Sequence, residues 1–392
     1  MELEEMISEI ELAAKDCNCG NPHNKITIEA MTVGDNAFEK CADFTAMKKY
    51  EHVLLVADVR TYAAAGENLN TILEKKGSVT SVCLIEPNVN GDVVADEVSI
   101  VQVMLELNDN IDAIIAVGSG TIHDIARFCG AKTSKPFISI PTAASVDGFT
   151  SLGAPIIVRG VKKTFQTVSP IALFADINVL VNAPQEMTAA GFGDMLAKFT
   201  SLSDWSFSQL IACEAYCPLS ASITKEALLE CVEKVDQIAA REEEGIRSLI
   251  TALIQSGLAM LIFGQSHPAS GGEHHLSHYW EMEFLQKDRP QVLHGAKVGV
   301  SSIILAKLYK QWYGADFSHL PSELQEHAVK ITAIVENIPD ADILKNWLVK
   351  MGGPTTPDDI GIGADLVERS LQEAYLLRDR YTMLKCFNVG LE

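Results

Sequence analysis

Short apolar segments that alternate with longer helical stretches are the feature that most limits how the first half of this chain can fold. Four such segments lie at residues 52–59, 79–87, 112–120 and 136–144, and helical stretches such as residues 95–109 stand between them. Apolar runs of about four to eight residues separated by helices indicate parallel strands, because a parallel pair needs a crossover long enough to hold a helix. The pattern therefore predicts an α/β unit with a mainly parallel sheet.

The end of this unit and the start of a second one can also be placed. Residues 154–170 predict a hairpin that turns at Arg159 and Gly160, and a last strand lies within residues 171–184. Beyond Pro184 the apolar residues recur at helical spacing almost to the end of the chain. We therefore expect two domains in these 392 residues. They are an α/β domain over residues 1–183 and an all-α domain over residues 184–392.

The charge of the chain limits its partners. The net charge is −21, whereas nucleic acids and anionic membranes bind basic surfaces, so we expect neither as a partner. Residues 248–272 hold no charged side chain, but Thr251, Gln255 and Gly257 interrupt their apolar residues. This stretch is therefore expected to be a core helix and not a membrane span.

The cysteines indicate a reducing compartment. Nine cysteines are spread along a chain whose acidic N-terminus lacks a secretory signal, which predicts free thiols and a cytoplasmic protein. Cys17 and Cys19 lie near His23, but a CxC pair with one histidine is an incomplete set of zinc ligands. Cys213 and Cys217 have helical spacing, which favours two small apolar side chains on one helix face.

A glycine-rich turn follows one of the predicted strands. In the sequence AVGSGTIHD, Gly118 and Gly120 let the backbone approach a ligand, and the free N–H groups of the following helix suit a phosphate. His123 breaks the GxGxxG pattern of dinucleotide-binding turns. A tight turn without any ligand is the alternative.

Two further strand ends carry polar residues. Asp58 ends the strand at residues 52–59, where a carboxylate either accepts hydrogen bonds from an adenosine ribose or caps the next helix. Ligands of open parallel sheets bind at the carboxyl ends of strands, so polar residues there are candidates for ligand contacts. Four of them follow the strand at residues 136–144: Thr142, Ser145, Asp147 and Ser151.

Histidines are concentrated in one part of the second half. Five of the ten fall between His267 and His294. If the residues after the paired glycines form a helix, His274 and His278 share one face of it, while Asp194 follows a Gly-Phe-Gly turn earlier in the chain. One carboxylate and two imidazoles with an open fourth position are typical of a catalytic zinc, nickel or iron site. Histidines that only face solvent or fill the core are the alternative.

The chain resembles a known family in five motifs that occur in the same order over residues 50–300. They are AVGSGTIHD, SIPTAASVDGFTSLGAPI, AAGFGDMLAKFTSLSDW, PASGGEHHLSH and LHGAKVG. These motifs resemble those of the bacterial sn-glycerol-1-phosphate dehydrogenases, which belong to the superfamily of glycerol dehydrogenase, iron-containing alcohol dehydrogenases and dehydroquinate synthase. The resemblance implies a dinucleotide-binding domain, a helical metal-binding domain, catalysis in the cleft between them, and a homodimer.

The resemblance also implies roles for individual residues. The implied metal ligands are Asp194, His274 and His294. The implied substrate contacts are Asp147, Asp194 and His278, of which Asp194 and His278 are also the catalytic candidates. The implied contacts to the nicotinamide dinucleotide are Asp58, Gly118, Ser119, Gly120, Thr121, Ile122, Thr142, Ala143, Ala144, Ser145 and Ser151.

The implied reaction is the reversible reduction of dihydroxyacetone phosphate to sn-glycerol 1-phosphate by NADH or NADPH. It needs one divalent metal ion per chain, nickel or zinc before iron. Asp58 favours NADH, because a carboxylate repels the 2′-phosphate of NADPH. The phosphate of this small-molecule substrate needs cations in an acidic protein. Four lysines are candidates, of which Lys198 shares a helix face with Asp194, although solvated or ion-paired lysines are the alternative: Lys162, Lys163, Lys198 and Lys297.

Other functions compete with this one. A glycerol dehydrogenase would use the same metal and cofactor on the unphosphorylated alcohol. A lyase similar to dehydroquinate synthase fits the PASGGEHHLSH and SVDGFTSLGAP motifs less well. A regulatory protein that binds nucleotide and metal without turnover would not need the complete set of Asp194, His274 and His294.

Overall fold

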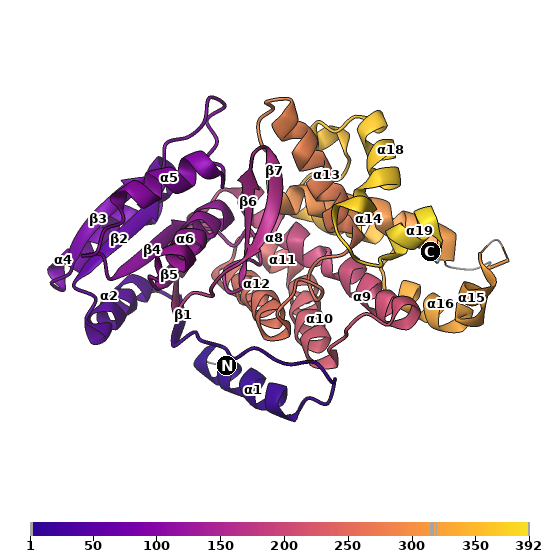
Figure 1. Cartoon of the computed structure of the whole chain (residues 1–392), viewed down its shortest axis with the longest axis horizontal. Coiled ribbons are helices and arrows are strands. Elements are labelled where there is room, and N and C mark those ends of the chain that lie inside the picture. The colour runs from indigo at the N-terminus through magenta and orange to yellow at the C-terminus, as the bar shows by residue number, and fades with distance from the viewer. Residues whose placement is uncertain (1–2, 314–316, 319, 391–392) are drawn as a thin grey trace.

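A computed structural model of the chain describes residues 3–313, 317–318 and 320–390. An α/β half and a helical half lie side by side (Figure 1). All strands of the main sheet are parallel, and their order is β1-β8-β5-β4-β2-β3. Their bounds are β1 Ala30–Gly34, β2 His52–Ala57, β3 Val79–Leu84, β4 Ala113–Gly118, β5 Phe137–Pro141 and β8 Ala172–Asp176.

Helices cover both faces of this sheet. The side chains of β2 alternate between the two faces, so that Leu55 packs on one side and Leu54 on the other. Burial on both faces is the reason why these strands are apolar without interruption. The first face packs against α2 (Ala37–Lys48) and α4 (Glu67–Lys75), and the second against α5 (Glu97–Glu106) and α6 (Gly120–Thr133).

The hairpin is formed by β6 (Gly153–Val158) and β7 (Val161–Gln166), which are antiparallel. Arg159 and Gly160 have φ angles of 52° and 74°, and a two-residue turn of this kind requires positive φ at both positions. The turn therefore lies where the sequence predicts it. The predicted fold class, a mainly parallel α/β unit followed by a helical one, is confirmed.

The rest of the chain is helical. Short helical segments complete the α/β half: α3 (Val59–Thr61), the π-helix η1 (Tyr62–Gly66) and α7 (Ile177–Asn182). The helices of the other half begin with α8 (Gln185–Leu196), α9 (Lys198–Ala212), α10 (Pro218–Glu233), α11 (Val235–Ala239), α12 (Glu243–Phe263), α13 (Gly272–Gln286) and α14 (His294–Tyr313). They continue with α15 (Ser322–Glu326), α16 (Ala328–Glu336), α17 (Ala341–Lys350), η2 (Asp358–Ile360), α18 (Ala364–Glu373), η3 (Ala374–Leu377) and α19 (Met383–Val389).

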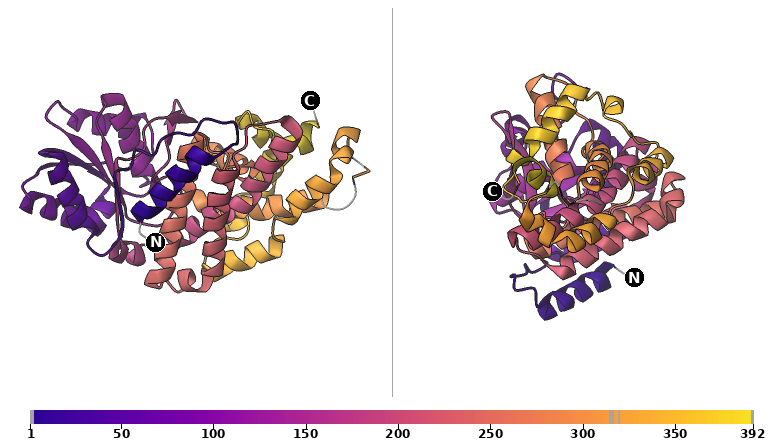
Figure 2. Two further views of the ribbon diagram at one scale, coloured as in Figure 1. Left: turned by 90° about the horizontal axis from the view of Figure 1, so that it is seen from below. Right: turned by 90° about the vertical axis from the view of Figure 1, so that its right-hand side faces the viewer.

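The N-terminal segment lies against the helical half. Helix α1 (Leu3–Asp16) runs along the outside of that half (Figure 2). Met6 and Ile28 belong to the same apolar cluster as Leu249 and Leu253 of α12. The predicted domain boundary after residue 183 falls between α7 and α8, but residues 3–28 pack with the second half although they precede the sheet.

Helix α12 is the uncharged stretch that resembles a membrane span. It is long and apolar enough to cross a bilayer, with a mean hydropathy of 1.7, yet 83% of that window is buried inside the protein. Its neighbours include α10, α11 and α8. It is a core helix, as the sequence predicts.

Candidate active site

Three side chains from three helices converge beside the sheet. Asp194 comes from α8, His274 from the first turn of α13, and His294 is the first residue of α14. One ligand atom from each lies within 4.8 Å of the others. The rings of His274 and His294 are 5.1 Å apart between centroids. The structure therefore brings together the three residues that the sequence singles out as metal ligands.

Two glycines allow this convergence. A Cβ atom on Gly295 would lie 1.8 Å from the carbonyl oxygen of Ala190, and one on Gly193 would lie 2.5 Å from that of Gly295. Helices α8 and α14 therefore touch backbone to backbone, at a distance that no side chain permits. This contact explains why each of the two motifs places a glycine directly beside its ligand residue.

The hydrogen bond that His274 makes through Nδ1 leaves its Nε2 available to bind a metal ion. Its Nδ1 lies 2.8 Å from Oε1 of Glu273, a carboxylate that only accepts hydrogen bonds when ionised, so the proton of the neutral imidazole is on Nδ1. Nε2 then carries a lone pair and lies 4.0 Å from Oδ1 of Asp194. Burial holds the pKa of His274 well below its usual value, and the nearby Lys198 lowers it further. A neutral imidazole backed by a carboxylate is a common metal ligand.

Lys198 lies behind the metal ligands. Its side chain is fully buried, and its Nζ is 2.8 Å from Oδ1 of Asp194 and 2.7 Å from Oδ2 of Asp147. Burial alone would lower the pKa of Lys198, but the two carboxylates outweigh it and raise the pKa above its usual value. The Lys198 ammonium also donates to Ala269 O and does not line the cavity described below. Lys198 therefore orients the carboxylates of Asp194 and Asp147 from a position outside the cavity wall.

His278 lies on the cavity side of the same site. Its ring centroid is 6.2 Å from that of His274 and 6.1 Å from that of His294. Arg378 donates from Nη2 to Nδ1 of His278 at 3.2 Å. Because arginine has no acceptor, Nδ1 must be the unprotonated nitrogen, and the Nε2 of His278 carries the proton. Burial holds the pKa of this imidazole well below its usual value, so it is neutral near pH 7.

A cavity of about 1230 Å³ extends from these residues to the edge of the sheet. Its wall includes both imidazoles, His274 and His294, and the turn between β4 and α6. The predicted nucleotide and substrate contacts that line it are Ser119, Gly120, Thr121, Ser145, Ser151, Asp147 and His278. Those that do not line it are Asp58, Gly118, Ile122, Thr142, Ala143, Ala144 and Asp194.

The residues outside the cavity wall have structural contacts of their own. Asp58 caps α3 through Oδ1, which accepts from the N–H groups of Arg60 and Thr61, and the parallel register places it at the same sheet edge as Gly118. A Cβ on Gly118 would lie 2.6 Å from Cγ1 of Ile122. The position of Asp58 is thus compatible both with a contact to an adenosine ribose and with a helix cap. The helix cap is the contact that the structure contains.

The remaining candidate lysines line the cavity. Lys162 in the hairpin and Lys297 in α14 both lie within 3.1 Å of the carboxylate of Glu281. Burial raises the pKa of Glu281, but the two lysines outweigh it and lower the pKa below its usual range. Glu281 therefore offsets one of the two positive charges of Lys162 and Lys297, whereas no described carboxylate of the chain lies within 4 Å of Lys163 or Arg378.

Arg378 is a site residue that the sequence does not reveal. It lies in the last fifteen residues of the chain, outside every recognised motif, and reaches the cavity between Ser266, Ser270 and His278. Burial lowers its pKa to about 10, and it still carries its charge at neutral pH. No local pattern marks it, because its partners are about a hundred residues away in the sequence.

Known proteins resemble this chain over nearly its whole length. A family model described as iron-containing alcohol dehydrogenase matches residues 32–184. Glycerol-1-phosphate dehydrogenase (NAD(P)+) of Geobacillus stearothermophilus is 50% identical over 98% of this chain and 98% of its own. The protein of the same name from Bacillus subtilis strain 168 is 45% identical over 95% of this chain and 94% of its own.

Solved structures share the fold at low identity. The crystal structure of glycerol dehydrogenase from Schizosaccharomyces pombe has a TM-score of 0.68 and is 19% identical, covering 93% of this chain and 86% of that one. At this identity the likeness concerns the fold alone.

Proposed function

The chain belongs to the family of NAD(P)+-dependent glycerol-1-phosphate dehydrogenases, and on that premise we propose that it interconverts dihydroxyacetone phosphate and glycerol 1-phosphate. Family membership confirms the resemblance carried by the five sequence motifs, and it identifies the chain as an oxidoreductase. It favours neither a glycerol dehydrogenase that acts on the unphosphorylated alcohol nor a regulatory protein that binds nucleotide and metal without turnover. The observation that carries the proposal is the cavity that joins the β4–α6 turn to His274 and His294, which lie together with the buried Asp194.

The cofactor is proposed to lie along the carboxyl edge of the sheet. The first turn of α6 begins at Gly120 and offers unpaired backbone N–H groups to a pyrophosphate. Ser119 and Ser145 line the cavity beside it, with their hydroxyl oxygens 2.6 Å apart. From this turn the cavity leads to His274 and His294, which directs the nicotinamide end of the dinucleotide toward the ligand residues.

The donor set suits a divalent ion. Two neutral imidazoles and one carboxylate within 4.8 Å of each other suit zinc, nickel or iron, and the order that we propose, nickel or zinc before iron, rests on the family resemblance. When bound there, such an ion would polarise the carbonyl group of the substrate as a Lewis acid. Lys198 holds the Asp194 carboxyl group in place, and Glu273 fixes the ring of His274.

The reduction transfers a hydride and a proton. A hydride leaves C4 of the reduced nicotinamide for the carbonyl carbon, and the oxygen gains a proton. His278 is proposed to donate a hydrogen bond from Nε2 to this oxygen, because Arg378 leaves the proton of its ring on Nε2, and the proton that the oxygen gains comes from solvent water. The positive charge of Arg378 also disfavours protonation of Nδ1, which keeps the imidazole neutral between turnovers.

Arg378 is proposed to hold the substrate phosphate together with Lys163. Both line the cavity without a described carboxylate partner, whereas Lys162 and Lys297 share Glu281. A guanidinium next to His278 places the phosphate of a three-carbon substrate close enough for the Nε2 of His278 to reach the carbonyl oxygen. This assignment distinguishes the phosphorylated substrate from free glycerol.

The test is oxidation of reduced nicotinamide, followed by its absorbance, with stripped full-length protein and added nickel, zinc or iron. We expect turnover of dihydroxyacetone phosphate to exceed that of dihydroxyacetone, and NADH to serve better than NADPH if Asp58 faces the ribose. Arg378→Ala should raise KM for dihydroxyacetone phosphate by about 10- to 100-fold, while turnover of dihydroxyacetone falls much less.

Arg369→Ala is the matched control, because Arg369 also lines the cavity but is already paired with Glu283. Equal losses in both variants, or a preference of the wild type for the unphosphorylated ketone, would contradict the assignment. A wild type without turnover in any metal would favour a binding protein.

Two further properties are proposals. A homodimer is expected from the family resemblance, and sedimentation of the purified chain tests it. A cytoplasmic location is supported by nine free cysteines, none of them in a disulfide.

A further inference from the structure

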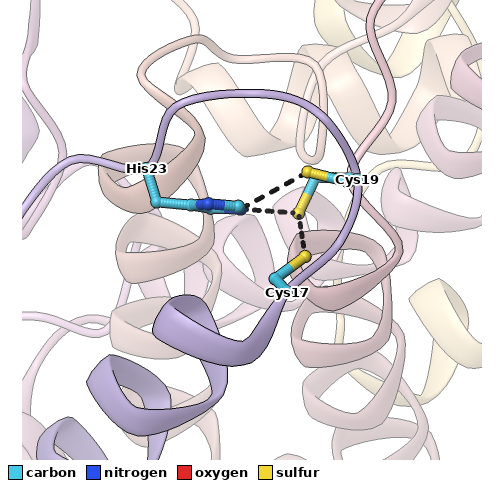
Figure 3. A group of neighbouring side chains, drawn as sticks. Cys17, Cys19 and His23 are labelled. Atoms are coloured by element: carbon cyan, nitrogen blue, oxygen red, sulfur yellow. Dashed lines mark hydrogen bonds between the residues drawn. The ribbon is translucent and has the colours of Figure 1, made fainter.

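A second group of ligand-type side chains lies outside the cavity, at the junction between the N-terminal segment and the helical half. Cys17, Cys19 and His23 stand in the loop after α1 and point toward one another (Figure 3). The fourth member, Cys217, is the N-cap residue of α10, 194 positions after His23. Cys213 is the C-cap of α9, so the prediction that Cys213 and Cys217 share one helix face was wrong.

The four side chains already have the spacing of a tetrahedral site. Sγ of Cys17 is 3.9 Å from Sγ of Cys217, and Nε2 of His23 is 3.6 Å from Sγ of Cys19 and 3.2 Å from Sγ of Cys217. Zinc–sulfur bonds of about 2.3 Å and zinc–nitrogen bonds of about 2.0 Å give tetrahedron edges of about 3.8 Å between sulfurs and about 3.6 Å between sulfur and nitrogen. One ligand atom from each residue lies within 4.8 Å of all the others.

Neighbouring groups hold the loop in this place. Asn21 donates from Nδ2 to the carbonyl oxygen of Tyr216 at 2.9 Å, which fixes the loop to the residue before Cys217. The backbone N–H of Ser220 donates to Sγ of Cys217 at 3.4 Å. The thiols of Cys17 and Cys19 pack beside an apolar cluster centred on the fully buried Trp205. The group is therefore held by contacts from both chain segments.

The other cysteines show no such arrangement. Cys41, Cys129 and Cys231 are each buried in an apolar cluster, where a thiol acts as a small apolar side chain. Only the group at the N-terminal loop combines several thiols with an imidazole among the described residues of the chain.

We propose that Cys17, Cys19, His23 and Cys217 bind one zinc ion in a closed structural site. Three thiolates and one imidazole occupy all four positions of a tetrahedral ion, so no position is left for a substrate. None of the four lines the cavity, whereas the site of Asp194, His274 and His294 has only nitrogen and oxygen ligands and borders it. The two sites therefore differ in ligand chemistry as well as in place.

The zinc ion would tie the start of the chain to the wall of the cavity. Asn24, directly after the ligand loop, donates from its backbone N–H to Ile262 O at 2.8 Å and from Nδ2 to Leu261 O at 3.0 Å. These carbonyls belong to the last turn of α12, and the residues that follow, Gly264 to His267, line the cavity.

Cobalt substitution tests the proposal on the full-length reduced chain, without substrate or nucleotide. Stripped protein is titrated with Co²⁺, and the thiolate-to-cobalt charge-transfer band is followed in the near ultraviolet. The ligand set of Asp194, His274 and His294 contains no sulfur and cannot produce this band. We expect the band in the wild type, its unchanged presence in His274→Ala, and its bleaching by one equivalent of Zn²⁺ per chain.

Single variants assign the band to its ligands. Cys17→Ser and Cys217→Ser should lose most of it, while Cys213→Ser, at an exposed cysteine four positions before Cys217, should keep it. His23→Gln should weaken zinc affinity at least about tenfold. A wild type without the band, a band that persists in the Cys17 and Cys217 variants, or a band lost in Cys213→Ser would overturn the proposal. If those variants do not fold, the wild-type titration and its bleaching endpoint decide.

Discussion

Glu273 is the residue on which the geometry of the metal ligands depends most. Its Oε1 accepts hydrogen bonds from Nδ1 of His274 and from the backbone N–H of Gly271 at 2.6 Å, and its Oε2 accepts one from Thr200 at 2.7 Å. Such partners fix both the tautomer and the orientation of a ligand imidazole. Glu273 thus acts on the metal through His274.

We predict that Glu273→Gln lowers the affinity for nickel or zinc by about 10- to 100-fold, because an amide accepts the imidazole proton more weakly than a carboxylate does. A chelator competition titration measures this. Glu233→Gln, the same exchange at an exposed position of α10, is the control and should leave the affinity unchanged. Equal affinity in both variants would show that Glu273 has no such role.

A second residue-level prediction concerns acid stability. Burial raises the pKa of Glu214, but His267, whose Nε2 is 3.6 Å away, and the backbone N–H of Tyr381 outweigh it and lower the pKa from 4.5 to about 2. A lowered folded-state pKa gives stability that is present above pH 4.5 and is lost as the pH falls toward 2. The difference amounts to about 3 kcal/mol.

The free energy of unfolding of metal-free wild type should therefore exceed that of Glu214→Gln by about 3 kcal/mol at pH 6, and by about half as much at pH 3. Denaturant unfolding at both values measures it. A difference that is independent of pH would mean that Glu214 acts by packing and not by its charge.

Among single residues, the sequence predicts those that stand in or directly beside a recognisable motif. Asp194, His274 and His294 each stand beside a glycine motif, and their meeting could be expected. Arg378 and Cys217 could not, because their partners are distant in the sequence and no spacing connects them.

Helices α8 and α14 meet through glycines, which makes the crossing sensitive to a single methyl group. In an isolated helix Gly→Ala would stabilise by about 1 kcal/mol. In Gly295→Ala the new Cβ would meet Ala190 O at 1.8 Å, and a backbone oxygen cannot move aside as a side chain can.

We therefore predict that Gly295→Ala destabilises the protein by about 1–3 kcal/mol and lowers metal affinity, because Asp194 and His294 separate. Thermal unfolding and metal titration measure the two effects. Gly34→Ala is the control, since its Cβ would meet only Arg247 at 3.7 Å. A stabilised Gly295→Ala variant would show that the two helices have room to move apart.

Strands, like single residues, could be predicted where the sequence carries a distinctive pattern. The strands β2 to β5 and the β6–β7 hairpin could be predicted, because burial on both faces or a turn with positive φ leaves a clear pattern. Strand β1 could not, because five residues that include a small alanine and a final glycine have no distinctive pattern. It pairs only with β8, at the sheet edge.

For the whole molecule, metal binding should raise the free energy of unfolding. An ion that binds only the folded chain stabilises it by about 4 kcal/mol at a free concentration of about 1000 times Kd. Chelation of the metal should therefore lower Tm, and nickel should restore it. His294→Ala should abolish the nickel-dependent shift, whereas Cys17→Ser should keep it. A shift that survives in His294→Ala would place the nickel elsewhere.

The route of the chain between the two halves has one more consequence. The polypeptide enters the sheet from the helical half at β1 and leaves it again after β8, and these two strands are direct neighbours, with Ala30 beside Ala172 and Gly34 beside Asp176. The two links thus stand at opposite ends of one strand pair, about 13 Å apart along strands of five residues. Both chain connections between the halves are thus carried by the β1 edge of the sheet, and elsewhere only noncovalent contacts, such as that of Lys162 with Glu281, hold the two halves together.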